Sequence, residues 1–101
     1  MKRTLITLAL ALSAAAPAMA DLALAKAKNC MACHAVDKKL VGPSFKDVAA
    51  KYASQKDATD KLAAKILKGG GGVWGPLAMP ANPSVNDAES KALAAWVLQQ
   101  K

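Results

Sequence analysis

Cys30-Met31-Ala32-Cys33-His34 places two thiols three positions apart and an imidazole directly after the second thiol. C-x-x-C-H is the pattern of covalent haem attachment, in which the thiols bond to the haem vinyl groups and the histidine binds the iron. We therefore interpret Cys30 and Cys33 as the attachment residues for one haem c. His34 is then an axial ligand of the iron.

Two cysteines at this spacing also occur in other kinds of site. A thioredoxin-like redox pair lies in a strand–helix–strand unit, and the sequence shows no such alternation. A zinc site needs four ligands, whereas the chain offers two cysteines, one histidine and scattered carboxylates. A structural disulfide remains as an alternative, but it does not require a histidine after the second cysteine. The haem interpretation is therefore favoured.

The first twenty residues have the features of an export signal. A basic pair at positions 2 and 3 precedes an apolar stretch over 5–16, and Ala18-Met19-Ala20 has the small residues that signal peptidase recognises. We predict a cleaved signal peptide over 1–20 and a periplasmic location for the mature protein. The uncharged run of 17 residues is slightly short for a spanning helix, so an uncleaved anchor is the less favoured alternative.

Residues 21–101 are predicted to form a single domain, which is small for a hydrophobic core of its own. A bound haem supplies a large apolar body around which short helices can pack. We therefore expect the haem-free protein to be poorly folded. The mature domain has 12 lysines against 7 acidic residues. This excess is too small, in an exported chain, to indicate nucleic-acid binding.

The expected fold class is all-α, with about four short helices around the haem. Helix-forming residues run over 22–31, up to and into the haem motif. Three further helices are indicated by N-caps and by apolar residues at helical spacing. The first follows Ser44 and has Phe45, Val48, Ala49 and Tyr52 on one face, and the second runs from Asp57 or Thr59 to Gly69. The third runs from Asn86 to Gln99, with Glu89 in a capping box and with Leu93, Trp96 and Val97 facing inward.

The stretch 69–85 contains four consecutive glycines and three X-Pro pairs, so it is not helical. A long loop in so small a domain usually carries function. Its central residue is Met79, and thioether sulfur is a common second ligand for a haem that transfers electrons. The other methionine of the mature domain, Met31, lies between the attachment cysteines, on the wrong side of the ring. We predict Met79 as the second axial ligand; a methionine that fills an apolar gap is the alternative.

Further blocks extend the motif in a fixed order: Val41-Gly42-Pro43 leading into 46–52, then Gly72-Val73-Trp74-Gly75-Pro76, then 79–82, and Ala95-Trp96-Val97-Leu98 at the end. With these blocks the chain resembles a small bacterial class I cytochrome c. That family includes the short periplasmic single-haem proteins that donate electrons to nitrite reductases or terminal oxidases. The resemblance covers nearly all of the mature region.

The resemblance implies supporting roles for three residues. The Pro43 carbonyl would accept the Nδ1–H of His34, the Trp74 indole would donate to a haem propionate, and the Asn82 amide would contact the Met79 sulfur. Each role has an alternative. Pro43 could form an ordinary Gly-Pro turn, Trp74 could belong to the core, and Asn82 could form a turn before proline.

Two other positions are structural or unusual. Trp96 is expected to pack the last helix onto the first. Lys65 stands where some relatives place an arginine near the inner propionate, and a lysine makes a point-charge contact without the bidentate fork.

The resemblance also implies an electron carrier of the respiratory chain, not an enzyme, whose iron alternates between Fe(II) and Fe(III). The donor would be a membrane cytochrome complex, and the acceptor a nitrite reductase or terminal oxidase. We expect a monomer without stable membrane insertion. The partner surface would be the exposed haem edge, an apolar patch with lysines around it: Met31, Ala32, Val41 and 77–80, with Lys28, Lys38, Lys39 and Lys46. A haem protein with an open sixth site and a haem-free thiol–disulfide protein are the alternative function classes.

Overall fold

The computed structural model describes residues 17–101. Its elements are four α-helices and one short 3₁₀ turn: α1 (Pro17–Ala27), η1 (Cys30–Ala32), α2 (Phe45–Tyr52), α3 (Ala58–Lys68) and α4 (Asp87–Leu98). Within this range the only β-type pairing is an isolated bridge between Gly70 and Met79. The expected all-α fold class is confirmed.

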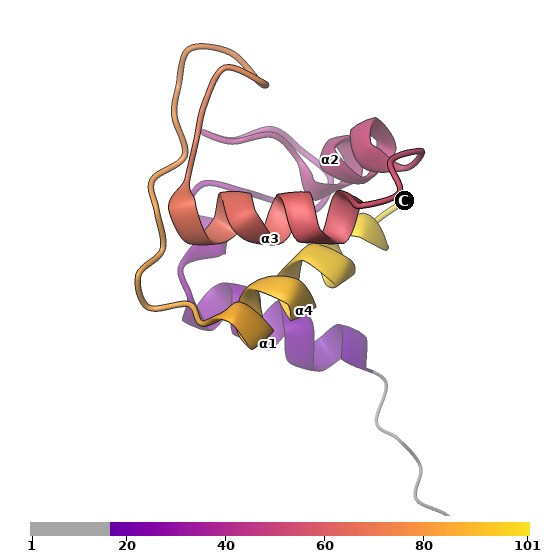
Figure 1. The fold of residues 1–101 in the computed structure, drawn as a ribbon, viewed down its shortest axis with the longest axis vertical. Coiled ribbons are helices and arrows are strands. Elements are labelled where there is room, and N and C mark those ends of the chain that lie inside the picture. The colour runs from indigo at the N-terminus through magenta and orange to yellow at the C-terminus, as the bar shows by residue number, and fades with distance from the viewer. Residues whose placement is uncertain (1–16) are drawn as a thin grey trace, which may run out of the picture.

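Helix α4 is the centre of the fold, because it packs against α1, α2 and α3 (Figure 1). Its inward residues Leu93, Trp96 and Val97 are buried, as predicted from their spacing. The facing helices contribute their own apolar stripes, namely Phe45, Val48, Ala49 and Tyr52 from α2, and Ala58, Leu62 and Ala63 from α3. Burial of these stripes is the main favourable contribution to folding.

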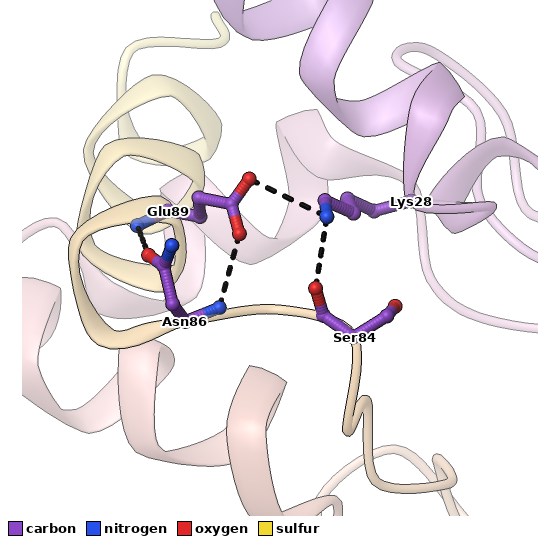
Figure 2. A network of polar contacts seen from close by, with 4 residues as sticks. All are labelled: Lys28, Ser84, Asn86 and Glu89. Carbon is purple, nitrogen blue, oxygen red and sulfur yellow. Dashed lines mark hydrogen bonds and ion pairs between the residues drawn. The ribbon is translucent and has the colours of Figure 1, made fainter.

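Two of the predicted N-caps make capping hydrogen bonds. The Ser44 hydroxyl accepts the N–H of Asp47 at 3.1 Å and starts α2. Asn86 and Glu89 form the reciprocal capping box of α4, in which each side chain accepts the other residue's N–H, at 2.8 and 3.1 Å (Figure 2). At α3 the capping residue is Asp57, but its side chain makes no capping hydrogen bond.

The same corner of the molecule joins α1 to α4. The Lys28 ammonium donates to the carbonyl of Ser84 at 2.8 Å and lies 3.4 Å from the Glu89 carboxylate (Figure 2). This contact ties the end of the first helix to the start of the last.

The first helix differs from the prediction at both ends. Among the described residues it covers Pro17–Ala27, whereas the sequence pattern indicated residues 22–31. Asn29 has a left-handed backbone with φ of 62°, which interrupts the helix, and Cys30–Ala32 then form a separate 3₁₀ turn. Asparagine tolerates this conformation better than most residues, so helix propensity alone overestimated the length.

The predicted signal peptide extends over 1–20, of which 1–16 lie outside the described residues. The proposed cleavage site after Ala20 falls inside α1. No helix within residues 17–101 has the length and apolar character needed to cross a membrane.

Candidate haem site

A cavity of about 570 Å³ opens between η1, α2, α3, α4 and the loop 69–85. Its size is typical of cofactor pockets. Of the residues predicted for the site, the lining includes Cys30, Cys33, His34, Pro43, Trp74 and Met79. The fold therefore brings together side chains that are up to 49 positions apart in the sequence.

The two cysteines lie on a compact turn. The N–H groups of Cys33 and His34 both donate to the carbonyl of Cys30, at 3.2 and 3.0 Å. Both cysteines are half-buried, and before attachment burial raises the pKa of the Cys30 thiol. Within residues 17–101, no group of three or more His, Cys, Asp or Glu side chains is placed to hold a metal ion.

His34 is held in one tautomer. Its Nδ1 lies 2.8 Å from the carbonyl oxygen of Pro43. A carbonyl oxygen only accepts hydrogen bonds, so Nδ1 carries the proton and Nε2 keeps its lone pair. An Nε2 lone pair is what a metal needs from a neutral imidazole, and the Nδ1 hydrogen bond raises its basicity.

Two residues touch His34 that the sequence analysis did not assign to the site. The Phe45 ring stacks on the imidazole, with 5.0 Å between the ring centroids. Gly42 lies so close that a Cβ there would meet the imidazole atoms. Phe45 was predicted only as part of a helix face and Gly42 only as part of a Gly-Pro turn. Nothing in the local sequence indicates that both lie against His34.

Met79 is half-buried on the loop 69–85, and its backbone pairs with Gly70. Asn82 is not part of the cavity lining. Its side-chain amide donates to the carbonyl of Ile66 at 2.8 Å and its backbone N–H to that of Leu67 at 3.3 Å, so it anchors the loop to α3. The contact of the Asn82 amide with the Met79 sulfur stays a prediction.

Trp74 and Lys65 stand at the edge of the cavity. Trp74 is 42% exposed, so it does not belong to the packed core, and the Lys51 ammonium lies 5.4 Å from the centre of its ring. Lys65 of α3 also lines the cavity. Trp96, in contrast, is 4% exposed and meets Phe45 of α2 edge-to-face.

The mouth of the cavity is unusually apolar. Large hydrophobic side chains that are exposed there and line the cavity are Leu40, Val41, Val73, Trp74 and Leu77. Of the lysines predicted around this patch, Lys28 is occupied by Ser84 and Glu89, whereas Lys38, Lys39 and Lys46 are exposed. The partly buried Met31 packs against the core instead of extending the patch.

The donor set of the cavity fits a covalently attached haem. It offers two thiols for the vinyl groups, an imidazole with a free Nε2, a thioether and a largely apolar lining. Iron porphyrins in proteins are held by such ligands in such surroundings.

Comparisons with known proteins agree with this assignment. A sequence model described as cytochrome c matches residues 22–101. Cytochrome c-552 of Nitrosomonas europaea is 55% identical over 90% of this chain and 88% of its own length. Cytochrome c-551 of Stutzerimonas stutzeri is 52% identical over the full length of both chains. The crystal structure of wild-type N. europaea cytochrome c552 superposes with a TM-score of 0.78 at 55% identity, over 79% of this chain and 99% of that one.

The cysteine pair, the helical fold and these relatives lead to one conclusion. Cys30 and Cys33 are the attachment residues for haem c, and the protein is an electron carrier rather than an enzyme. The chain belongs to the cytochrome c family, among the small class I cytochromes c.

Proposed function

We propose that His34 and Met79 bind the haem iron from opposite sides, and that the protein carries single electrons between redox partners in the periplasm. The observation that supports this most strongly is that both side chains line one cavity, His34 with Nε2 free and Met79 on a paired backbone. Two protein ligands that stay bound in both oxidation states keep the structural change on electron transfer small. They also leave no open position for a small molecule.

Each residue near the ligands has a distinct task in this proposal. The Pro43 carbonyl fixes the tautomer of His34 and strengthens its donor nitrogen. The apolar lining excludes water, and together with the thioether it biases the reduction potential upward. Trp74 and Lys65, at the cavity edge, are the proposed partners of the propionates. Asn82 steadies the Met79 segment by its bonds to α3, and its second amide N–H is the proposed donor to the sulfur.

The apolar mouth is the proposed docking surface. Val41 and Leu77 are 57% and 70% exposed there, and Lys38, Lys39 and Lys46 are exposed nearby in the sequence. An apolar contact with a basic rim favours a partner whose own surface is apolar with acidic groups around it. We propose a membrane cytochrome complex as donor and a nitrite reductase or terminal oxidase as acceptor. Association should slow as salt rises, because salt screens the exposed lysines.

Export and processing are part of the same proposal. The basic pair at positions 2 and 3, the apolar stretch 5–16 and the small residues before position 21 support cleavage after Ala20. Mass spectrometry of the protein from the periplasmic fraction should give a chain that begins at Asp21 and carries one haem. A chain that retains residues 1–20 would contradict the predicted processing.

The axial ligands are tested by visible spectroscopy of three proteins: wild type, Met79→Ala and the matched control Met31→Leu. Wild type and Met31→Leu should both show sharp bands when reduced and a weak far-red band when oxidised. Met79→Ala should lose the far-red band and bind carbon monoxide in the ferrous form. A far-red band that survives in Met79→Ala would reject Met79 as ligand. A high-spin spectrum in the wild type would favour an open-site sensor or peroxidase instead.

A further inference from the structure

The His34 ring needs more than its hydrogen bond to be fixed in space. The bond from Nδ1 to Pro43 holds one ring atom, and the ring can still tilt about that contact. Two further residues close this freedom, and neither of them is a donor to the ring or to iron.

The backbone of Gly42 lies directly beside the imidazole, with no side chain between them. A Cβ at this position would be in severe contact with Cε1 of His34 and would lie 2.8 Å from Nδ1 and 3.0 Å from Nε2. The backbone of Gly42 is outside the positive-φ region, so the glycine is needed for space and not for conformation. Its N–H donates to the carbonyl of Cys33 at 2.7 Å, which ties this backbone to the residue before His34.

Phe45 supplies a flat apolar surface for the ring. The two ring planes are 23° apart with 5.0 Å between centroids. Phe45 is itself fixed, because its N–H donates to the carbonyl of Ala35 at 3.0 Å and its ring meets Trp96 edge-to-face at 5.3 Å. Phe45 and Trp96 are 5% and 4% exposed, so neither ring can turn without disturbing the core.

We propose that Gly42 and Phe45 are positioning residues that set the rotation of the His34 imidazole about its bond to the iron, and that Trp96 holds Phe45 in place. This inference rests on the proposed axial role of His34. It gives the buried pair Phe45–Trp96 a function beyond packing: the core of the domain is rigidly connected to the orientation of one axial ligand.

The orientation of an axial imidazole has a measurable electronic consequence. The plane of the imidazole, together with the orientation of the opposite ligand, selects which of two nearly equivalent iron d orbitals holds the unpaired electron of low-spin Fe(III). The spin density on the four haem methyl groups depends on which orbital is occupied. It does not depend on the overall stability of the protein. Groups around a ligand are known to set its orientation and to tune the metal in this way.

The test uses the haem-loaded protein and the proton NMR spectrum of its oxidised form, in which the haem methyl signals are shifted by the unpaired electron. Phe45→Leu removes the stacked ring but keeps an apolar side chain, and Gly42→Ala pushes on the imidazole without removing anything from the core. Both should redistribute the methyl shifts. The low-spin spectrum should persist, as should the far-red band that reports ligation by Met79. Phe45→Tyr keeps the ring and should keep the wild-type pattern.

Leu24→Ala is the control for stability. Leu24 of α1 packs against the core and is not part of the cavity lining, so the variant should unfold more easily with an unchanged methyl pattern. Unchanged patterns in Phe45→Leu and Gly42→Ala would overturn the inference, as would an equal change in Leu24→Ala. If Phe45→Leu does not fold, Gly42→Ala alone decides. A wild type without a low-spin spectrum would instead refute the axial ligation itself.

Discussion

Gly70 and Met79 form an antiparallel backbone pair, in which the Met79 N–H donates to Gly70 at 2.8 Å and the Gly70 N–H donates to Met79 at 3.1 Å. The pair closes the loop 71–78 at its base. It also holds the backbone of Met79 beside Gly70, which follows closely after the end of α3 at Lys68. The glycine run is therefore mechanically connected to the proposed second ligand.

We predict that Gly69→Ala disturbs Met79 from outside the cavity. A Cβ at Gly69 would be in severe contact with the Met79 carbonyl and would lie 2.9 Å from the carbonyl carbon of Pro80, and the residue has φ of 73°. The strained backbone should lower the free energy of unfolding by about 1–3 kcal/mol. Displacement of the 79–80 segment should weaken the far-red band. Denaturant unfolding and the oxidised visible spectrum measure the two effects.

Gly72→Ala is the control for that variant. Gly72 also has a positive φ, 85°, but a Cβ there would meet no atom within 4 Å. It should carry a backbone penalty without a loss of the far-red band. Bands of equal strength in the two variants would contradict the connection between Gly69 and Met79.

The capping box at the start of α4 makes a second prediction. Asn86→Ala removes the acceptor of the Glu89 N–H and should lower the free energy of unfolding by about 1 kcal/mol. Asn86→Ser keeps an acceptor and should stay close to wild type. Chemical denaturation followed by circular dichroism measures both, and equal losses in the two variants would argue against a capping role.

Stability should also depend on pH through Glu89. The pKa of its carboxyl is lowered, mainly because it accepts the Asn86 N–H and further because of the Lys28 ammonium. A pKa lowered by folding means that the charged group stabilises the native state above the ordinary glutamate value of 4.5, and that this contribution is lost as the pH falls below it.

Glu89→Gln isolates the contribution of the Glu89 charge to stability, because glutamine also serves in a capping box but cannot ionise. The free energy of unfolding of wild type minus that of the variant should be largest at neutral pH and should shrink as the pH is lowered through 4.5. Denaturant titrations at a series of pH values give this difference. A difference that does not vary with pH would show that the charge of Glu89 is irrelevant.

The caps and the attachment motif could be predicted from the sequence because each depends on residues a few positions apart. The start of α2 is indicated by Ser44, and that of α4 by Asn86 and Glu89, all within the first turn. The attachment motif lies within five positions, from Cys30 to His34. The end of α1 was placed too late because a single residue, Asn29, stopped the helix by its left-handed backbone. Propensity summed over a window does not resolve such an event.

The environment of His34 could not be predicted for a different reason. Phe45 was correctly predicted on a buried helix face, but its neighbours depend on how α2 packs against α4 and against the segment that follows η1. The same holds for the pairing of Gly70 with Met79, which joins positions separated by a loop without regular structure. These contacts are set by tertiary packing, and no local pattern encodes them.

The haem-free protein should fail to fold cooperatively. Val73, Trp74 and Leu77 line the haem cavity and are 39–70% exposed on the protein side, so the haem is the apolar body that they would pack against. A Cys30→Ser/Cys33→Ser double variant, purified without haem, should lose the sharp thermal transition that circular dichroism records for the haem-loaded protein. A transition of equal sharpness in both would contradict this expectation.

The axial pair is tested most directly by proton NMR of the reduced, haem-loaded protein with isotope-labelled methionine methyl groups. A methyl group bound next to iron lies over the porphyrin face, where the ring current shifts its signal far upfield. We predict one such methionine signal, present in wild type and Met31→Leu and absent in Met79→Ala. No upfield methyl signal in the wild type, or one that persists in Met79→Ala, would contradict ligation of the iron by Met79 opposite His34.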